Sequence, residues 1–148
     1  MIMKNEIHLE QFYPHPVARI WECLTNPGIL KEWSNLNKTV PFEARVGFTW
    51  TETAKPRPGW DGNMYFEVLE VIPEQKLVYS FRGGPEPGVI NLDTIVTWSL
   101  VNQGEGTLLK LDHTGFTGLR GAMTNFIMEK GWQKSFFRRL EALLNQPA

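Results

Sequence analysis

The C-terminal segment, from about residue 122 to 145, limits most strongly what this chain can fold into. Its large apolar side chains recur at helical spacing and are interpreted as one stripe: Met123, Phe126, Ile127, Trp132, Phe136, Leu140 and Leu143. Basic residues such as Lys130 and Arg138 form the opposite stripe. A helix of about six turns with so wide an apolar face has to be covered by other structure. We therefore expect Trp132 and Phe136 to lie under a sheet and to contact strand residues such as Trp98.

Before this helix, the hydrophobic pattern has a period of two, which is typical of strands with one buried face. Residues 6–13 form the first such segment, and further short segments between residues 40 and 114 are separated by turn residues. Two short helices begin at Pro16 and Pro27, because proline is favoured in the first helical turn. The order predicts a single α+β domain over residues 1–148. Its seven-stranded antiparallel sheet wraps around the long C-terminal helix, with the two short helices after the first strand.

Aromatic residues are abundant: the chain has six Trp, nine Phe and three Tyr, or 12% of its residues. Strand alternation turns many of these rings toward the long helix. Large rings can line a pocket or simply fill a core, and the sequence is compatible with both.

The turns of a meander alternate between the two ends of its sheet, and here the long loops fall at one end. These loops are residues 54–62, 83–92 and 115–121. Binding residues tend to lie on loops held by a rigid scaffold, so we expect the largest cavity to open there. The candidate ligand-binding residues are Trp33, Phe48, Trp50, Glu52, Trp60, Tyr79, Phe81, Trp98, His113, Phe116 and Phe126.

His113 is the most informative polar residue, because its alternation with Leu109 and Leu111 turns it toward the interior. A half-buried histidine can be a general base, a hydrogen-bond donor to a ligand, or a satisfied core residue. Glu52, an inward-facing carboxylate near the same opening, is its candidate partner.

The composition disfavours several classes of protein. Fifteen Lys and Arg against sixteen Asp and Glu give a net charge of −1, whereas nucleic-acid and anionic-membrane proteins need a basic excess. One Cys and three His predict neither a disulfide framework nor a metal site, and no other cofactor is predicted. No segment is apolar enough for a signal peptide or a membrane span, so we expect a cytoplasmic protein. Homodimer formation is left open.

Six short motifs lie in order along most of the chain. They are Pro16-x-x-x-Ile20-Trp21-x-x-Leu24-Thr25, Trp33, Gly47-Phe48, Val71-Ile72-Pro73-x-x-x-Leu77, Gly106-Thr107-x-Leu109 and Gly131-Trp132. Their order and spacing resemble the START-like superfamily (SRPBCC, the helix-grip fold), and within it the domain family named after the activator of the heat-shock protein 90 ATPase. The resemblance implies a deep cavity for apolar ligands between sheet and helix. It implies no fixed catalytic residues, since members range from lipid carriers to polyketide cyclases.

Three functions follow as hypotheses. The aromatic interior favours a carrier or sensor that binds a hydrophobic small molecule. The first alternative is a cyclase- or hydrolase-type enzyme that uses His113 and Glu52 as an acid–base pair. It is disfavoured because no nucleophile, base and orienting group occur together in the sequence. The second alternative is a domain that interacts with a chaperone.

Overall fold

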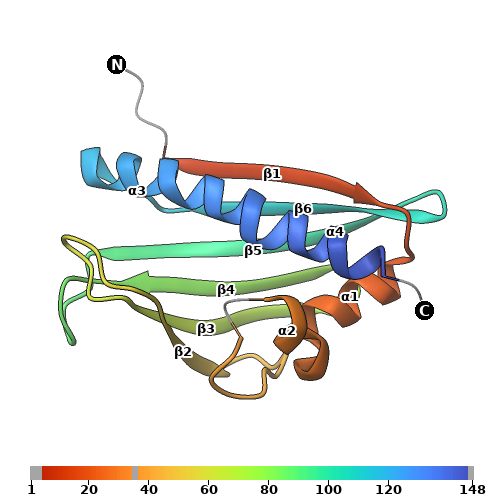
Figure 1. Cartoon of the computed structure of the whole chain (residues 1–148), viewed down its shortest axis with the longest axis horizontal. Coiled ribbons are helices and arrows are strands. Elements are labelled where there is room, and N and C mark those ends of the chain that lie inside the picture. The colour runs from red at the N-terminus through yellow and green to blue at the C-terminus, as the bar shows by residue number, and fades with distance from the viewer. Residues whose placement is uncertain (1–4, 35–36, 147–148) are drawn as a thin grey trace.

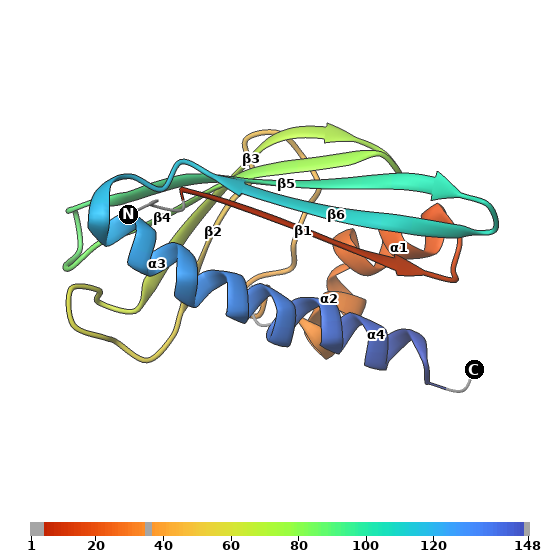
Figure 2. The same cartoon turned by 90° about the horizontal axis from the view of Figure 1, so that it is seen from above.

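A computed structural model of the chain describes residues 5–34 and 37–146. Its elements in chain order are β1 (Glu6–Tyr13), α1 (Val17–Thr25), α2 (Pro27–Trp33), β2 (Thr49–Thr53), β3 (Asn63–Ile72), β4 (Lys76–Gly83), β5 (Leu92–Gln103), β6 (Gly106–Thr114), α3 (Gly118–Gly131), the π-helical turn η1 (Trp132–Phe137) and α4 (Arg138–Leu144). The strands form one antiparallel sheet in the order β1-β6-β5-β4-β3-β2 (Figure 1). Together α3, η1 and α4 form one long helix along a single face of that sheet (Figure 2).

The α+β class, the antiparallel sheet and the long C-terminal helix are confirmed, but the described residues form six strands rather than seven. Residues 40–48 are partly apolar, yet they contain no strand. Gly47 adopts a φ of 91°, and the amide of Phe48 donates to the carbonyl of Arg45, so the chain turns here. The strand that pairs with β3 therefore begins only at Thr49.

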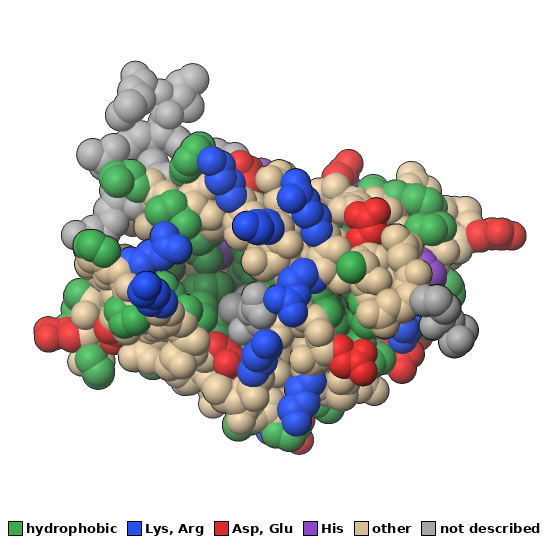
Figure 3. Space-filling model, viewed as in Figure 1, with side chains coloured by type: hydrophobic (Ala, Val, Ile, Leu, Met, Phe, Trp, Pro, Cys, Tyr) green, Lys and Arg blue, Asp and Glu red, His purple; other side chains and the backbone are tan. Residues whose placement is uncertain are grey.

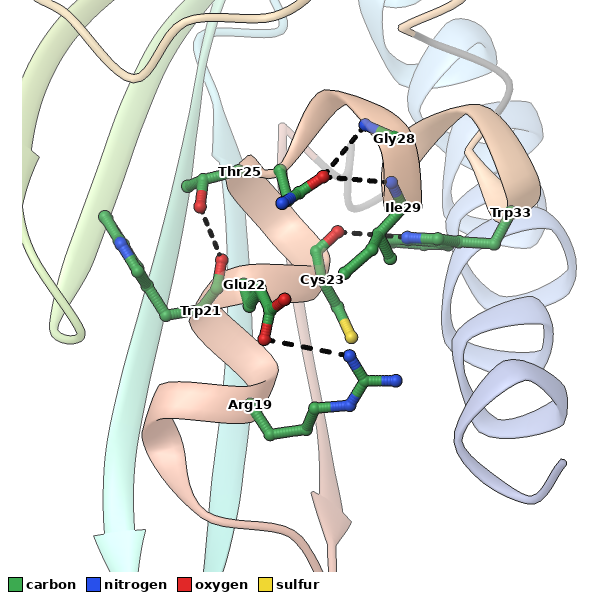
Figure 4. A network of polar contacts seen from close by, with 9 residues as sticks. Arg19, Trp21, Glu22, Cys23, Thr25, Gly28, Ile29 and Trp33 are labelled. Carbon is green, nitrogen blue, oxygen red and sulfur yellow. Dashed lines mark hydrogen bonds and ion pairs between the residues drawn. The ribbon is translucent and has the colours of Figure 1, made fainter. Parts of the chain in front are cut away.

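The two short helices meet at Asn26, as their sequences predict. Its Oδ1 accepts hydrogen bonds from the amides of Gly28 and Ile29 at 2.9 and 3.2 Å, which caps α2 (Figure 4). The indole of Trp33 donates to the carbonyl of Cys23 at 3.0 Å and so fastens α2 to α1. This junction holds Trp33 edge-on against Phe136 of the long helix, with ring centroids 5.1 Å apart.

The buried stripe of the long helix is confirmed only in its C-terminal half. Trp132, Phe136, Leu140 and Leu143 are buried, and Trp132 and Phe136 both contact Trp98 as expected. The extension of that stripe toward the N-terminus is wrong.

Met123, Phe126 and Ile127 are 63, 59 and 53% exposed. Trp132 lies nine positions after Met123 along α3. Nine positions are two and a half turns of an α-helix, which puts Met123 on the face opposite Trp132. The interior face of α3 instead carries Gly121 and Asn125.

Candidate functional site

The aromatic rings between the sheet and the long helix form one connected cluster. Its sheet half runs from Trp50 through Phe66 to Phe81, with centroid separations of 4.7 and 4.8 Å. Its helix half joins Trp98, Trp132 and Phe136, with separations between 4.7 and 5.7 Å. We call this assembly the ring cluster: Trp33, Trp50, Phe66, Tyr79, Phe81, Trp98, His113, Phe116, Trp132 and Phe136.

Most of the predicted site residues lie in or beside the ring cluster. Phe48 stacks on Trp50 from a half-buried position, and Trp60 is also half-buried, with its indole donating to the carbonyl of Asn63. Phe126 is not part of the ring cluster, because its ring lies on the outer face of α3 under the ammonium of Lys130. Phe66, Trp132 and Phe136 belong to the cluster although they were absent from the predicted set. The period-two spacing of Phe66 in its strand, and the helical spacing of Trp132 and Phe136, were the sequence signals that could have identified them.

His113 is fully buried and makes two side-chain hydrogen bonds. The indole N–H of Trp132 donates to its Nδ1 at 3.0 Å, so Nδ1 must carry a lone pair. The neutral ring then has its proton on Nε2, which donates to Oγ1 of Thr94 at 2.7 Å. The Thr94 hydroxyl in turn donates a hydrogen bond to the carbonyl of Phe81 at 2.7 Å. Trp132, His113 and Thr94 therefore form a one-way chain of donors that ties the helix to the sheet.

Burial lowers the pKa of His113 to about 3, so the ring is neutral at physiological pH. Its single basic lone pair is occupied by the Trp132 indole. A general base needs a free lone pair within reach of the substrate proton. His113 in this arrangement is a satisfied core residue and does not offer one.

Glu52 is 3% exposed on β2, and its carboxylate has partners of its own. Oε1 accepts hydrogen bonds from the amides of Lys38 and Thr39 and from the Thr39 hydroxyl. These contacts fasten the segment after α2 to the edge of the sheet. The structure therefore does not form the predicted pair between Glu52 and His113.

The hydrogen bond from His113 to Thr94 can be tested by substitution. Thr94→Val keeps the shape of the side chain but leaves the buried Nε2–H without an acceptor, so we expect the free energy of unfolding to fall by about 1–3 kcal/mol. The control is Thr97→Val on the less buried face of the same strand, with an expected change within about 0.5 kcal/mol. Urea unfolding measures both values, and equal losses would contradict the assigned chain.

Two of the predicted long loops meet at one end of the sheet. The amide of Asp61, in loop 54–62, donates to the carbonyl of Gly84, in loop 83–92, at 3.0 Å. The turn before α3 lies at the same end (Figure 1). The space-filling view shows a hollow on this half of the molecule, below the N-terminal part of the long helix, with hydrophobic side chains on its floor (Figure 3).

A separate, open groove of about 510 Å³ lies at the opposite end of the sheet. It is lined by Val17, Pro73, Glu74, Gln75, Leu100, Val101 and Asn102. This lining mixes apolar and polar residues, and no residue of the ring cluster contributes to it. That the largest cavity opens between the three long loops stays a prediction.

Within the described parts of the chain, no helix is both long and apolar enough to cross a membrane. No three His, Cys, Asp or Glu side chains among residues 5–34 and 37–146 lie together as metal ligands.

The fold and the ring cluster define an α+β domain in which a long C-terminal helix closes the inner face of an antiparallel sheet. A family model described as "Activator of Hsp90 ATPase homolog 1-like protein" matches residues 14–145. The chain belongs to this family. No curated protein matches its sequence.

Solved structures share the fold over nearly the whole chain. A protein of Mesorhizobium loti is 29% identical with a TM-score of 0.80, and the match covers 97% of this chain and 98% of that one. CalU16 of Micromonospora echinospora is 23% identical with a TM-score of 0.72, covering 95 and 76% of the two chains. A Plasmodium falciparum protein described as an HSP90 activator is 17% identical with a TM-score of 0.72, covering 97 and 99%.

Proposed function

We propose that this chain binds an apolar small molecule between the sheet and its C-terminal helix, as a carrier or sensor. The observation that carries the proposal is the hollow floored by hydrophobic side chains on the half of the molecule where the loops meet (Figure 3). The ring cluster is adjacent to the long helix, and its rings offer large, rigid apolar surfaces. Each 100 Å² of ligand surface buried there would supply roughly 2.5 kcal/mol.

The polar atoms within the ring cluster also favour binding over catalysis. Trp98 donates its indole N–H to the Tyr79 hydroxyl at 3.1 Å, and the Trp132 indole donates to His113. Burial raises the pKa of Tyr79, which keeps its hydroxyl protonated. These groups satisfy one another and lie among apolar rings. An acid–base role for His113 would require breaking this network.

Contact with the chaperone Hsp90 is a second candidate function. One observation favours it: the family description names an activator of the Hsp90 ATPase, and a structure that shares the fold is described as an HSP90 activator. The exposed apolar residues of α3 would be available to such a partner.

Titration with the apolar fluorophore 1-N-phenylnaphthylamine tests the proposed function. We expect saturable binding to the parent protein, and about tenfold weaker binding to Phe81→Trp, because the larger ring fills space beside Phe66, His113 and Trp132. Ile95→Trp is the matched control, since Ile95 is 42% exposed on β5 and should leave the affinity unchanged.

Thermal unfolding tests whether both variants remain folded, and native mass spectrometry of the parent protein tests whether it retains a ligand from its host. Absence of both probe binding and a retained ligand would overturn the proposal. Stimulation of Hsp90 ATPase activity by the same preparation would then favour the second candidate.

A further inference from the structure

Asn125, on α3, is fully buried, and its side chain has no hydrogen-bond partner. Its Oδ1 and Nδ2 are the only buried side-chain polar atoms in the described chain that lack one. A buried polar group without a partner destabilises the fold, and such groups are rare in native proteins. An unpaired amide at such a position therefore requires an explanation.

Asn125 faces the ring cluster. It lies four residues after Gly121 and seven before Trp132, so the three share one side of the helix within about 40°. A Cβ added at Gly121 would lie 3.0 Å from the carbonyl carbon of Phe116, and Trp132 donates to His113. Since the His113 ring contacts both Phe116 and Trp132, Asn125 lies between these contact points, over the same part of the sheet.

We infer that Asn125 binds the polar edge of the ligand, an inference that rests on the proposed function. A primary amide presents one donor and one acceptor side by side in a plane. A ligand pairs with both atoms when it carries an acceptor opposite the donor and a donor opposite the acceptor. A lactam and an undissociated carboxylic acid both have this arrangement. A charged carboxylate is disfavoured, because the nearby His113 is neutral and an unpaired buried charge is far more costly than a neutral group.

The ligand class is therefore an apolar molecule that carries one lactam or carboxylic acid edge. Both amide atoms of Asn125 are covered by protein, so neighbouring side chains must move when such a ligand enters. The bound ligand then supplies the hydrogen bonds that the Asn125 amide lacks in the free protein. Part of the binding free energy comes from these bonds.

Two matched probes test the inference: 2-quinolone, a lactam fused to an apolar ring, and 1-methyl-2-quinolone, which lacks the N–H. We expect the parent protein to bind 2-quinolone about tenfold more tightly, the difference that one well-placed hydrogen bond supplies. In Asn125→Leu, the two probes should bind equally. Asn145→Leu, at an exposed asparagine on the end of α4, should keep the preference of the parent.

Thermal unfolding of the variants provides a second, independent readout. Asn125→Leu removes the unpaired amide, so its unfolding temperature should equal or exceed that of the parent. If Asn125→Leu and Asn125→Met both unfold at lower temperature, Asn125 supports the fold and the inference is overturned. Equal binding of both quinolones by the parent overturns the inference alone, provided that 1-N-phenylnaphthylamine binds. Failure of all three probes, together with the absence of a retained ligand, overturns the proposed function with it.

Discussion

Phe136→Ala should lower the free energy of unfolding by about 3–5 kcal/mol, the usual cost of removing a buried phenylalanine ring. Phe136 is 6% exposed and contacts three tryptophans from three parts of the fold. Its ring lies 4.7 Å from Trp132, 5.1 Å from Trp33 and 5.7 Å from Trp98, measured between centroids. Rings anchored in three elements cannot collapse easily into the space that alanine leaves, so the loss should fall near the upper end. Urea unfolding measures it.

Phe126→Ala is the matched control for this prediction, because it removes the same ring from the same helix. Phe126 is 59% exposed, and its main contact is the Lys130 ammonium 4.3 Å from the ring centroid. An exposed cation–π contact contributes about 0.5–1 kcal/mol, which sets the expected loss. Similar losses for the two variants would show that the helix is rotated relative to the arrangement described above.

The stability of the protein should fall as the pH is lowered from about 6.5 toward 3, and His113 should be a main cause. Its pKa is about 3 in the folded protein, against 6.5 when the chain is unfolded. Between these values the unfolded chain binds a proton that the folded protein excludes, so acid favours unfolding. At about 1.4 kcal/mol per pH unit, the cost reaches roughly 4–5 kcal/mol by pH 3. That is a large part of the stability of a typical domain.

His113→Gln separates this effect from other titrations, because glutamine keeps a donor and an acceptor but does not titrate. Between pH 7.5 and 4.5, the parent should lose roughly 2–3 kcal/mol more stability than the variant, by urea unfolding. His8 remains in both proteins. A hydrogen bond to Asp112 raises its pKa, so its stabilising effect is present below pH 6.5 and lost as the pH rises through its folded pKa. Parallel pH profiles for the parent and the variant would contradict the buried, neutral state of His113.

Sequence patterns of short range predicted most of the architecture. Alternation along β5 and β6 correctly turned Trp98 and His113 toward the helix, because successive side chains of a strand point to opposite faces. Asn26 and Pro27 identified the start of α2, because capping involves only neighbouring residues. The predicted count of seven strands is not confirmed. Gly47 and Phe48 bond to Val68 of β3, but the turn at these residues keeps residues 40–48 out of any strand, and strand pairing depends on a partner far along the chain.

Sequence alone determined the apolar faces of β5, β6 and the C-terminal half of the long helix, since periodicity is a property of consecutive residues. Only the tertiary structure decided which neighbour each inward side chain meets. Strand register and the segments that cover the sheet set the distances between side chains that lie far apart in the sequence. Glu52 meets the backbone of Lys38 and Thr39, and His113 meets Trp132 and Thr94. The same reason applies to Asn125. Its position on α3 follows from helical spacing, but its lack of a partner depends on everything packed around it.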